Sequence, residues 1–226
     1  TVLETAISGG SGTITAEYFG GSLSDGASGV LTKTNNSAGD ATISFSNLQK
    51  LSGNPFWYNG QVDFARHLTA SSLATPDIVL IELGVNDCFG QTTDDGVVSL
   101  TTTAFSQLDT LITSIKAANS NVKIGLCLSP KYADQDSFGL DYGASYTAWR
   151  CSRNISIWNR ELIKRYKDSE PQNIYVVASG FNVDTLTSYP TIQEPINSHN
   201  STLIDVQNNS VHPYSKGYLQ IGDAMF

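Results

Sequence analysis

Asn86 is the first side chain in this 226-residue sequence that could do chemistry. It follows an apolar run directly, so its amide N–H group could donate a hydrogen bond to an oxyanion developing in a reaction. One such donor is worth about 3 to 4 kcal/mol to a transition state. Gly84-Val85-Asn86-Asp87 is equally plausible as a turn, so the motif alone favours neither interpretation.

His212 is the second candidate, as a general base. Pro213 restricts it to extended geometry, and Gly217-Tyr218 and an amphipathic segment follow at once, so we expect the imidazole on a loop just ahead of a helix. A base on a loop between rigid elements is well placed for proton transfer. A single histidine, however, is more often structural than catalytic.

The elements that must position these side chains are predicted by hydrophobic periodicity. Short apolar runs typical of buried parallel strands occupy residues 77–83, 122–128 and 173–178. Helical spacing is found in residues 61–73, 100–118, 149–166 and 215–226. Alternating strands and helices predict a parallel, three-layer α/β/α sheet whose ligands bind at the carboxyl ends of the strands, and Asn86 lies at one of those ends.

Three other segments have patterns of their own. The alternation in Thr13–Phe19 predicts a strand. The aromatic and aliphatic stripe from Trp149 to Tyr166 is expected to lie in the core. Residues 181–210 are predicted to be irregular, and a binding role is the usual reason for so long a loop.

Composition predicts one domain over residues 1–226 and excludes several functions. The formal charge is −8, with 13 Lys and Arg residues spread along the chain, so nucleic acid is not an expected partner. No apolar run approaches the length of about 18 residues that would insert into a membrane.

The three cysteines do not indicate a metal site. The spacings of Cys88, Cys127 and Cys151 are those of neither a zinc site nor a disulfide framework, so we expect no metal and no cofactor. Cys127 lies within an apolar run and is expected to be a buried thiol.

Two of these motifs together resemble the SGNH (GDSL-like) hydrolases. Leu83-Gly84-Val85-Asn86-Asp87 resembles the family's Gly-x-Asn-Asp block, and Val211-His212-Pro213 with Gly217-Tyr218 resembles its Asp-x-x-His-Pro block. The resemblance spans residues 36–226 and implies a flavodoxin-like α/β/α fold. It also implies a serine esterase in which Asn86 and a glycine N–H bind the oxyanion and His212 is the base.

The remaining family positions are matched less closely. Asn209 stands where the family has the aspartate that orients the histidine; it can hydrogen-bond an imidazole but cannot stabilise its charge, and Asp205 is an alternative. Gly39, within Asn36–Thr42, is the candidate for the oxyanion glycine, with Ile7–Gly10 as the second choice.

The nucleophile has competing assignments. Ser22, in the string Phe19–Asp25, is one candidate, with Gly21 in the place of the usual Asp. Seventeen positions separate Ser22 from Gly39, fewer than a crossover helix and a parallel strand normally need. Alternatively, Thr13–Phe19 is the second strand of the sheet, and the first strand and the Gly-Asp-Ser block lie upstream in a longer polypeptide. A different serine, or none, is the third alternative.

The resemblance implies a serine-type carboxylic ester hydrolase. An acidic, polar chain without an apolar lid fits an esterified carbohydrate, such as an O-acetylated glycan, better than a lipid. Asn54–Phe64 adds a similarity to bacteriophage tail-associated esterase domains, which implies an extracellular or virion-surface location and a homo-oligomer or larger assembly. The competing hypothesis is a catalytically impaired domain of this fold that binds glycan or is structural. A nucleotide-binding domain is disfavoured, since no glycine-rich phosphate loop follows a strand.

Overall fold

The computed structural model describes residues 55–135, 138, 142 and 146–225, together with the backbone of three strands nearer the N-terminus. The chain divides into two compact units. Unit 1 comprises Thr1–Leu80 and Thr110–Val122, and unit 2 comprises Ile81–Asp109 and Lys123–Phe226. All side chains discussed below as candidates for chemistry, apart from Ser22 and Gly39, belong to unit 2.

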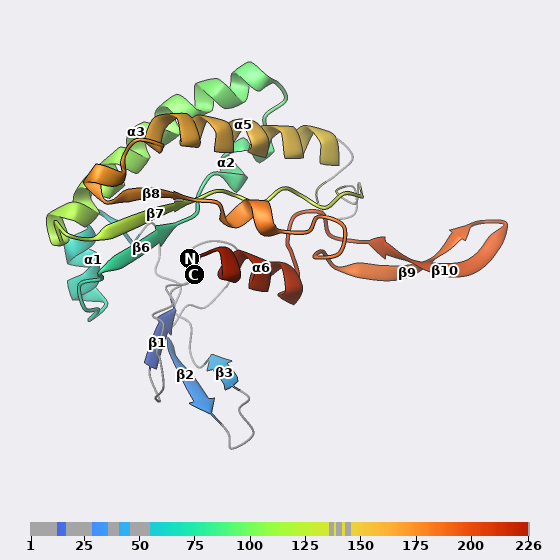
Figure 1. Cartoon of the computed structure of the whole chain (residues 1–226), viewed down its shortest axis with the longest axis horizontal. Coiled ribbons are helices and arrows are strands. Elements are labelled where there is room, and N and C mark those ends of the chain that lie inside the picture. The colour runs from blue at the N-terminus through green and yellow to red at the C-terminus, as the bar shows by residue number, and fades with distance from the viewer. Residues whose placement is uncertain are drawn as a thin grey trace. The chain divides into compact units, whose positions relative to one another are not determined.

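Unit 1 contains an antiparallel sheet. Its strands β1 (Thr13–Ala16), β2 (Gly29–Asn35) and β3 (Ala41–Phe45) pair in the order β1-β2-β3 (Figure 1). The predicted strand at Thr13 is confirmed, but its assignment to the parallel sheet was wrong, because β1 pairs antiparallel with β2. The physical reason is its alternating pattern, which suits an antiparallel strand with one covered face rather than a parallel strand covered on both.

A short hairpin and a helix follow in unit 1. Strands β4 (Trp57–Tyr58) and β5 (Gln61–Val62) are joined through Asn59 and Gly60, whose φ angles of 49° and 81° are those of a two-residue hairpin turn. Helix α1 (Phe64–Ala70) confirms the helix predicted within residues 61–73.

The α/β arrangement predicted for the fold is built on a second three-stranded sheet. Strands β6 (Ile78–Ile81), β7 (Lys123–Cys127) and β8 (Ile174–Val177) form a sheet in the order β6-β7-β8, and β7 and β8 are parallel. Consecutive strands lie side by side, as in one half of a doubly wound sheet. Further helices are α2 (Val85–Phe89), α3 (Asp94–Ala118), α5 (Ala148–Tyr166) and α6 (Ser215–Met225). In Figure 1, α2 and α5 cover one face of β7 and β8, and α6 covers the other.

The core of unit 2 is built around β7. Ile124 and Leu126 are fully buried, as a strand covered on both faces requires. Most of the predicted stripe of α5 is also buried, including Trp158 and Tyr166. Its first member is not: Trp149 is 69% exposed, so its assignment to the core was wrong. It lies in the first turn of α5, and helical periodicity cannot show where a helix begins to project beyond the sheet.

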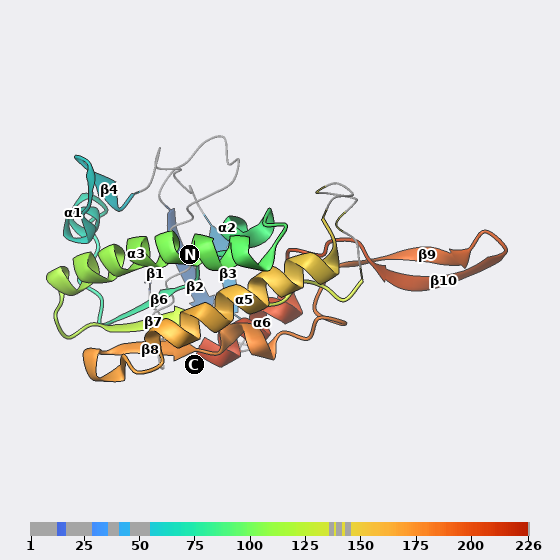
Figure 2. The ribbon, with the colours of Figure 1, turned by 90° about the horizontal axis from the view of Figure 1, so that it is seen from above.

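The stretch predicted as irregular, residues 181–210, contains regular structure. Strands β9 (Thr191–Asn197) and β10 (Asn200–Gln207) form an antiparallel hairpin that projects from the rest of unit 2 in both views (Figures 1 and 2). Pro195 lies within β9, where it is tolerated because a two-stranded hairpin consists of edge strands only.

Within the part of the chain that the structure describes, no helix is both long enough and apolar enough to cross a membrane.

Candidate functional site

Gly84 forces a sharp turn between β6 and the residue predicted to bind an oxyanion. Its φ of 111° and ψ of −17° belong to a region that favours glycine. A Cβ atom there would lie 2.0 Å from Cε2 of the Trp158 indole, so a larger residue has no room. Helix α2 therefore begins at Val85, and Asn86 lies exposed in its first turn.

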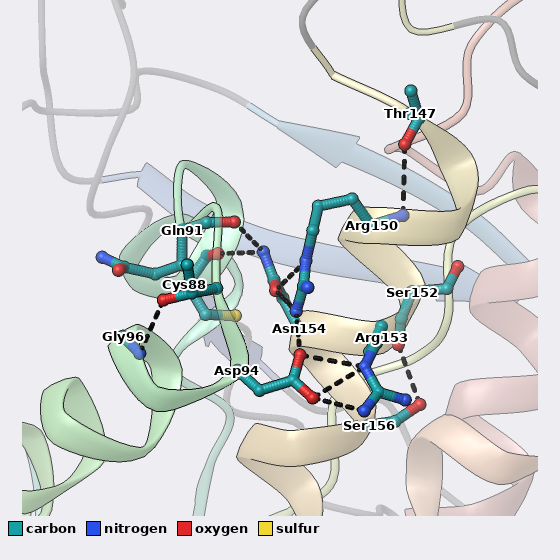
Figure 3. A network of polar contacts seen from close by, with 11 residues as sticks. Cys88, Gln91, Asp94, Gly96, Thr147, Arg150, Ser152, Arg153, Asn154 and Ser156 are labelled. Atoms are coloured by element: carbon teal, nitrogen blue, oxygen red, sulfur yellow. Dashed lines mark hydrogen bonds and ion pairs between the residues drawn. The ribbon is translucent and has the colours of Figure 1, made fainter.

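Asn154 of α5 holds α2 in place from the side. This fully buried amide donates to the carbonyl oxygens of Cys88, at 2.9 Å, and Gln91, at 2.7 Å (Figure 3). Asn154 thereby ties α5 to the last turn of α2 and to Gln91, just beyond the end of that helix. Phe89 adds an aromatic contact, since its ring stacks on that of Tyr146 with a centroid separation of 4.5 Å.

Two arginines and one carboxylate extend this network along α5. The guanidinium of Arg150 donates to Oδ1 of Asn154, with Nε at 2.8 Å, and its Nη2 atom lies 2.7 Å from Oδ1 of Asp94. Arg153 binds both oxygens of the same carboxylate (Figure 3). The hydrogen bonds from Arg153 and Arg150 lower the pKa of Asp94 to about 2, so this carboxylate is charged at all ordinary pH values.

Helix α5 also fixes the end of β7. Asn159 pairs with Ser129 as one peptide pairs with another: its Oδ1 accepts from the Ser129 N–H at 3.1 Å, and its Nδ2 donates to the Ser129 carbonyl at 2.8 Å. The end of β8 is tied to the same place, because the Ser179 hydroxyl donates to the Leu128 carbonyl at 3.0 Å. The carboxyl ends of β7 and β8 thus form a rigid edge.

Asn209 shapes the loop that carries His212. Its Oδ1 accepts from the backbone N–H groups of Val211 and His212, both at 2.9 Å, which is an Asx-type turn. Beside it, the Ser210 carbonyl accepts from the N–H of Ala133 at 3.0 Å. The loop is held by backbone hydrogen bonds on both sides, and the side chain of His212 is exposed.

The start of α6 is packed closely against the rest of this loop. A Cβ atom on Gly217 would lie 2.6 Å from Cβ of the buried Pro213 and 2.9 Å from the carbonyl oxygen of Ser188. The Tyr214 N–H donates to that same Ser188 carbonyl at 3.0 Å. Gly217 is therefore needed for close approach, and the segment that follows His212 has little room to move.

The predicted catalytic residues are distributed as follows. Asn86 lies in the first turn of α2, which follows β6, and His212 lies in the loop ahead of α6, two positions after Ser210, whose carbonyl accepts from the Ala133 N–H beyond β7. Ser22 and Gly39 lie outside the described residues. The Asn209 side-chain oxygen binds the loop backbone, and Asp205 accepts a hydrogen bond from Gln193 across the hairpin β9–β10.

Buried titratable groups near this edge have shifted pKa values. Burial raises the pKa of Cys88 to about 12 and that of Cys127 to about 11, so both thiols stay protonated and are not nucleophiles at neutral pH. Cys127 is thus the buried thiol that the sequence predicted. Burial also raises the pKa of Glu82 to about 7. In the described part of the chain, no three His, Cys, Asp or Glu side chains group as they would around a metal ion.

Sequence reasoning missed the residues that hold the site together. Asn154 and Asn159 were not singled out, because an asparagine inside a helix carries no local signal of what it contacts. Their positions are nevertheless informative. Asn154 and Asn159 lie five positions apart, and each places a polar group in the otherwise apolar stripe of α5. A buried polar group must be hydrogen-bonded, so such interruptions predict contacts to backbone groups.

Comparisons with known proteins give weak similarities. No protein-family model matches the chain, and no curated protein matches it significantly. Among solved structures, it is similar to an extracellular lipase of Streptomyces rimosus with a TM-score of 0.41 and 12% identity, over 72% of this chain and 76% of that one. A possible lipase of Chitinophaga pinensis gives 0.38 and 17% over 71% and 75%. A phospholipase A1 of Streptomyces albidoflavus gives 0.39 and 14% over the same shares. Similarities this low do not assign an activity.

Proposed function

We propose that this chain is a serine-type carboxylic ester hydrolase of the SGNH kind. The observation that supports the proposal is that the two segments that carry Asn86 and His212 are each fixed by hydrogen bonds of their own. Asn154 holds the first segment, and the Asn209 turn holds the second. A catalyst needs its hydrogen-bond donor and its base preorganised in this way.

The proposed reaction is acyl transfer to a serine. His212 takes the proton from the serine hydroxyl as its oxygen attacks the ester carbonyl, and the Asn86 amide donates to the resulting oxyanion. The alkoxide leaves with the proton from the histidine. Water then attacks the acyl-enzyme with the same base and releases the acid. Ser22, or a serine upstream of Thr1, supplies the nucleophile, and the N–H of Gly39 is the second oxyanion donor.

The proposed substrate is an esterified polysaccharide, and the proposed location is extracellular or on a virion surface. A net charge of −8 and a chain rich in Ser, Thr, Asn and Gly support a polar substrate outside the cell. Among the described residues of α2 and of the loop before α6, the exposed side chains are those of Asn86, Asp87, His212 and Tyr214, all of which carry a polar group. This suits a sugar ester better than a lipid.

Hydrolysis of p-nitrophenyl acetate tests the activity. His212→Ala is expected to lower kcat/KM by about 10³-fold or more. Asn86→Ala is expected to lower it by about 10²-fold to 10³-fold. His199→Ala is the matched control, because His199 is an exposed histidine in the hairpin turn and is expected to keep the full rate. Equal rates for all of these proteins would contradict an esterase that uses His212.

The nucleophile is tested by covalent labelling. A fluorophosphonate reacts with an activated serine, and mass spectrometry of the digested protein then identifies the labelled peptide. Labelling at Ser22 that is lost in His212→Ala is expected if this serine is the nucleophile. Labelling of an upstream Gly-Asp-Ser segment in a longer polypeptide supports the other assignment.

A second function is favoured by one observation: an asparagine stands at position 209, and its oxygen binds backbone N–H groups. Without a carboxylate beside the imidazole, hydrolysis is slowed by orders of magnitude. The domain would then be a catalytically impaired member of the fold that binds glycan or has a structural role. Asn209→Asp is the test, because a large gain in p-nitrophenyl acetate turnover supports an impaired catalyst. If Asn209→Asp gives no gain in turnover and no serine is labelled, the result supports a purely non-enzymatic domain.

A further inference from the structure

A pocket of 440 Å³ lies within unit 2, between the start of α5 and the segment that follows β7. It is a shallow depression that is wide open to solvent, so it could contact only part of a saccharide. The side chains that line it include one large aromatic ring and several polar groups, contributed by Asp134, Trp149, Ser152, Arg153 and Ser156. We propose that this pocket is a saccharide-binding subsite in which a pyranose ring stacks on the indole of Trp149.

The exposure of Trp149 is the first support. Its side chain is 69% exposed, although an indole of this size normally contributes to a core. Trp158, nine positions along the same helix, is 2% exposed. An aromatic face that stays open to solvent beside a pocket is a ready surface for the C–H groups of a sugar ring, which carry partial positive charge toward the negative face of the indole.

The fixed position of Trp149 is the second support. The Cζ atoms of Arg150 and Arg153 lie 5.4 and 5.9 Å from the centroid of its ring, within the range of cation–π contact. Both guanidinium groups are in turn bound by Asp94 (Figure 3). These contacts hold the indole in place although it is exposed. A ring that is already ordered loses little conformational freedom when a ligand binds.

The polar groups of the pocket are the third support. Arg153 uses Nε and Nη2 for Asp94, which leaves Nη1 as the part of the guanidinium that can donate to a ligand. One oxygen of the Asp134 carboxylate accepts from the Thr185 hydroxyl at 2.7 Å, so this side chain is oriented too. A donor and an acceptor flanking an aromatic face match the adjacent hydroxyl groups of a pyranose, each of which can donate and accept.

The charges around the pocket disfavour other ligands that stack on tryptophan. A nucleic acid base would bring phosphates to a chain of net charge −8, and the pocket-lining Arg153 is already paired with Asp94 in a pocket that the Asp134 carboxylate also lines. A quaternary ammonium group would lie close to two guanidinium groups that already contact the same indole, and like charges repel. A neutral sugar meets neither obstacle. That the sugar belongs to the ester substrate rests on the proposed function, whereas binding itself does not.

Nuclear magnetic resonance of the indole N–H groups tests the subsite. The chain has three tryptophans, so protein labelled with ¹⁵N-tryptophan is expected to give three indole signals, assigned with Trp57→Phe and Trp149→Phe. The probes are unesterified chitopentaose, xylopentaose and cellopentaose at up to about 10 mM, a concentration that detects binding weaker than 1 mM. We expect at least one of them to shift the Trp149 signal and to leave that of the buried Trp158 in place.

Binding variants complete the test. Trp149→Ala is expected to weaken binding of that saccharide by about tenfold or more in calorimetry, and Trp149→Tyr by less, because tyrosine keeps a stacking face. Trp57→Ala, which removes an exposed tryptophan of unit 1, is the matched control and is expected to have no effect. Circular dichroism of each variant checks that it is folded.

Three outcomes would overturn the subsite: no shift of the Trp149 signal with any of the saccharides, equal binding by folded Trp149→Ala, or a Trp149 shift produced only by inorganic phosphate or by tetramethylammonium. Because the probes carry no ester, the result is the same whether or not the chain hydrolyses esters. Failure of the subsite and failure of the proposed activity are therefore distinguishable.

Discussion

The two segments that carry Asn86 and His212 are both held by an asparagine, but in different ways. Asn154 is buried and reaches α2 from a helix 66 positions away in the sequence, where it satisfies two carbonyl oxygens. Asn209 is half-buried and binds N–H groups only two and three positions ahead. One segment is fixed by tertiary structure and the other by its own local turn.

This difference predicts how strongly substitutions in each segment change the stability of the protein. A long-range clamp exists only after the helix has packed, so its loss removes hydrogen bonds from a buried site and destabilises the packing of that helix. A local turn forms from a few neighbouring residues, so its loss changes the loop more than the fold. Substitutions around α2 are therefore expected to cost more stability than substitutions around His212.

The largest expected effect is that of Gly84→Ala. The new methyl group would meet the Trp158 ring at about 2 Å and would have to adopt a φ of 111°. We expect a loss of about 4 kcal/mol in the free energy of unfolding. Gly90→Ala, where a Cβ atom would meet nothing within 4 Å, is the matched control. Similar urea midpoints for the two variants would show that α2 is not fixed by this packing.

Substitution of Glu82, two positions before Gly84, is expected to give the next largest change in the free energy of unfolding. The size of that change depends on pH. The pKa of Glu82 in the folded state, about 7, lies above the ordinary glutamate value of 4.5 because the side chain is buried, so the folded state binds the proton more tightly. The stability that this proton gives is complete below about pH 4.5 and is lost as the pH rises to about 7.

Glu82→Gln removes that dependence. At pH 8 the variant is expected to be more stable than the wild type by about 3 kcal/mol, and at pH 4 the two are expected to be equal. Urea unfolding at several pH values measures this. A wild-type stability that stays constant between pH 4.5 and pH 7 relative to the variant would show that Glu82 titrates normally.

Asn154→Asp tests the long-range clamp itself. The carboxylate keeps the shape and can still accept from Arg150, but it cannot donate to the Cys88 and Gln91 carbonyls. We expect a loss of about 2 kcal/mol in the free energy of unfolding and a fall in any esterase rate that depends on Asn86. Ser156→Ala, on an exposed position of the same helix, is the control and should change stability by less than about 0.5 kcal/mol.

The smallest loss of stability is expected when the local turn at Asn209 is disrupted. Asn209→Ala removes an acceptor from two backbone N–H groups that solvent can partly replace, so we expect a loss of about 1 kcal/mol in thermal or urea unfolding. Asn209→Asp keeps that acceptor and should be nearly neutral. If Asn209→Ala destabilised the protein as strongly as Asn154→Asp, the contrast between a local turn and a long-range clamp would be wrong.

The fold was predictable wherever a pattern was strong and local. The runs of β6, β7 and β8 and the stripes of α3, α5 and α6 appear in the sequence, because burial on both faces or on one face leaves a distinct period. The hairpin β9–β10 was missed because most of it is exposed and buries nothing that would produce such a period. Trp149 was misplaced for a related reason, since a period gives the face of a helix but not its end.

The sequence by itself determined the α/β architecture, the turn at Gly84 and the loop at His212, because these depend on residues next to one another. Only the tertiary structure decided that Trp158 makes Gly84 obligatory, that Asn154 secures α2, and that Trp149 stays open beside a pocket. Those features arise from contacts between side chains distant in the sequence. The reason is physical: a buried polar group or a braced aromatic ring acquires its role only from the partner that packing brings to it.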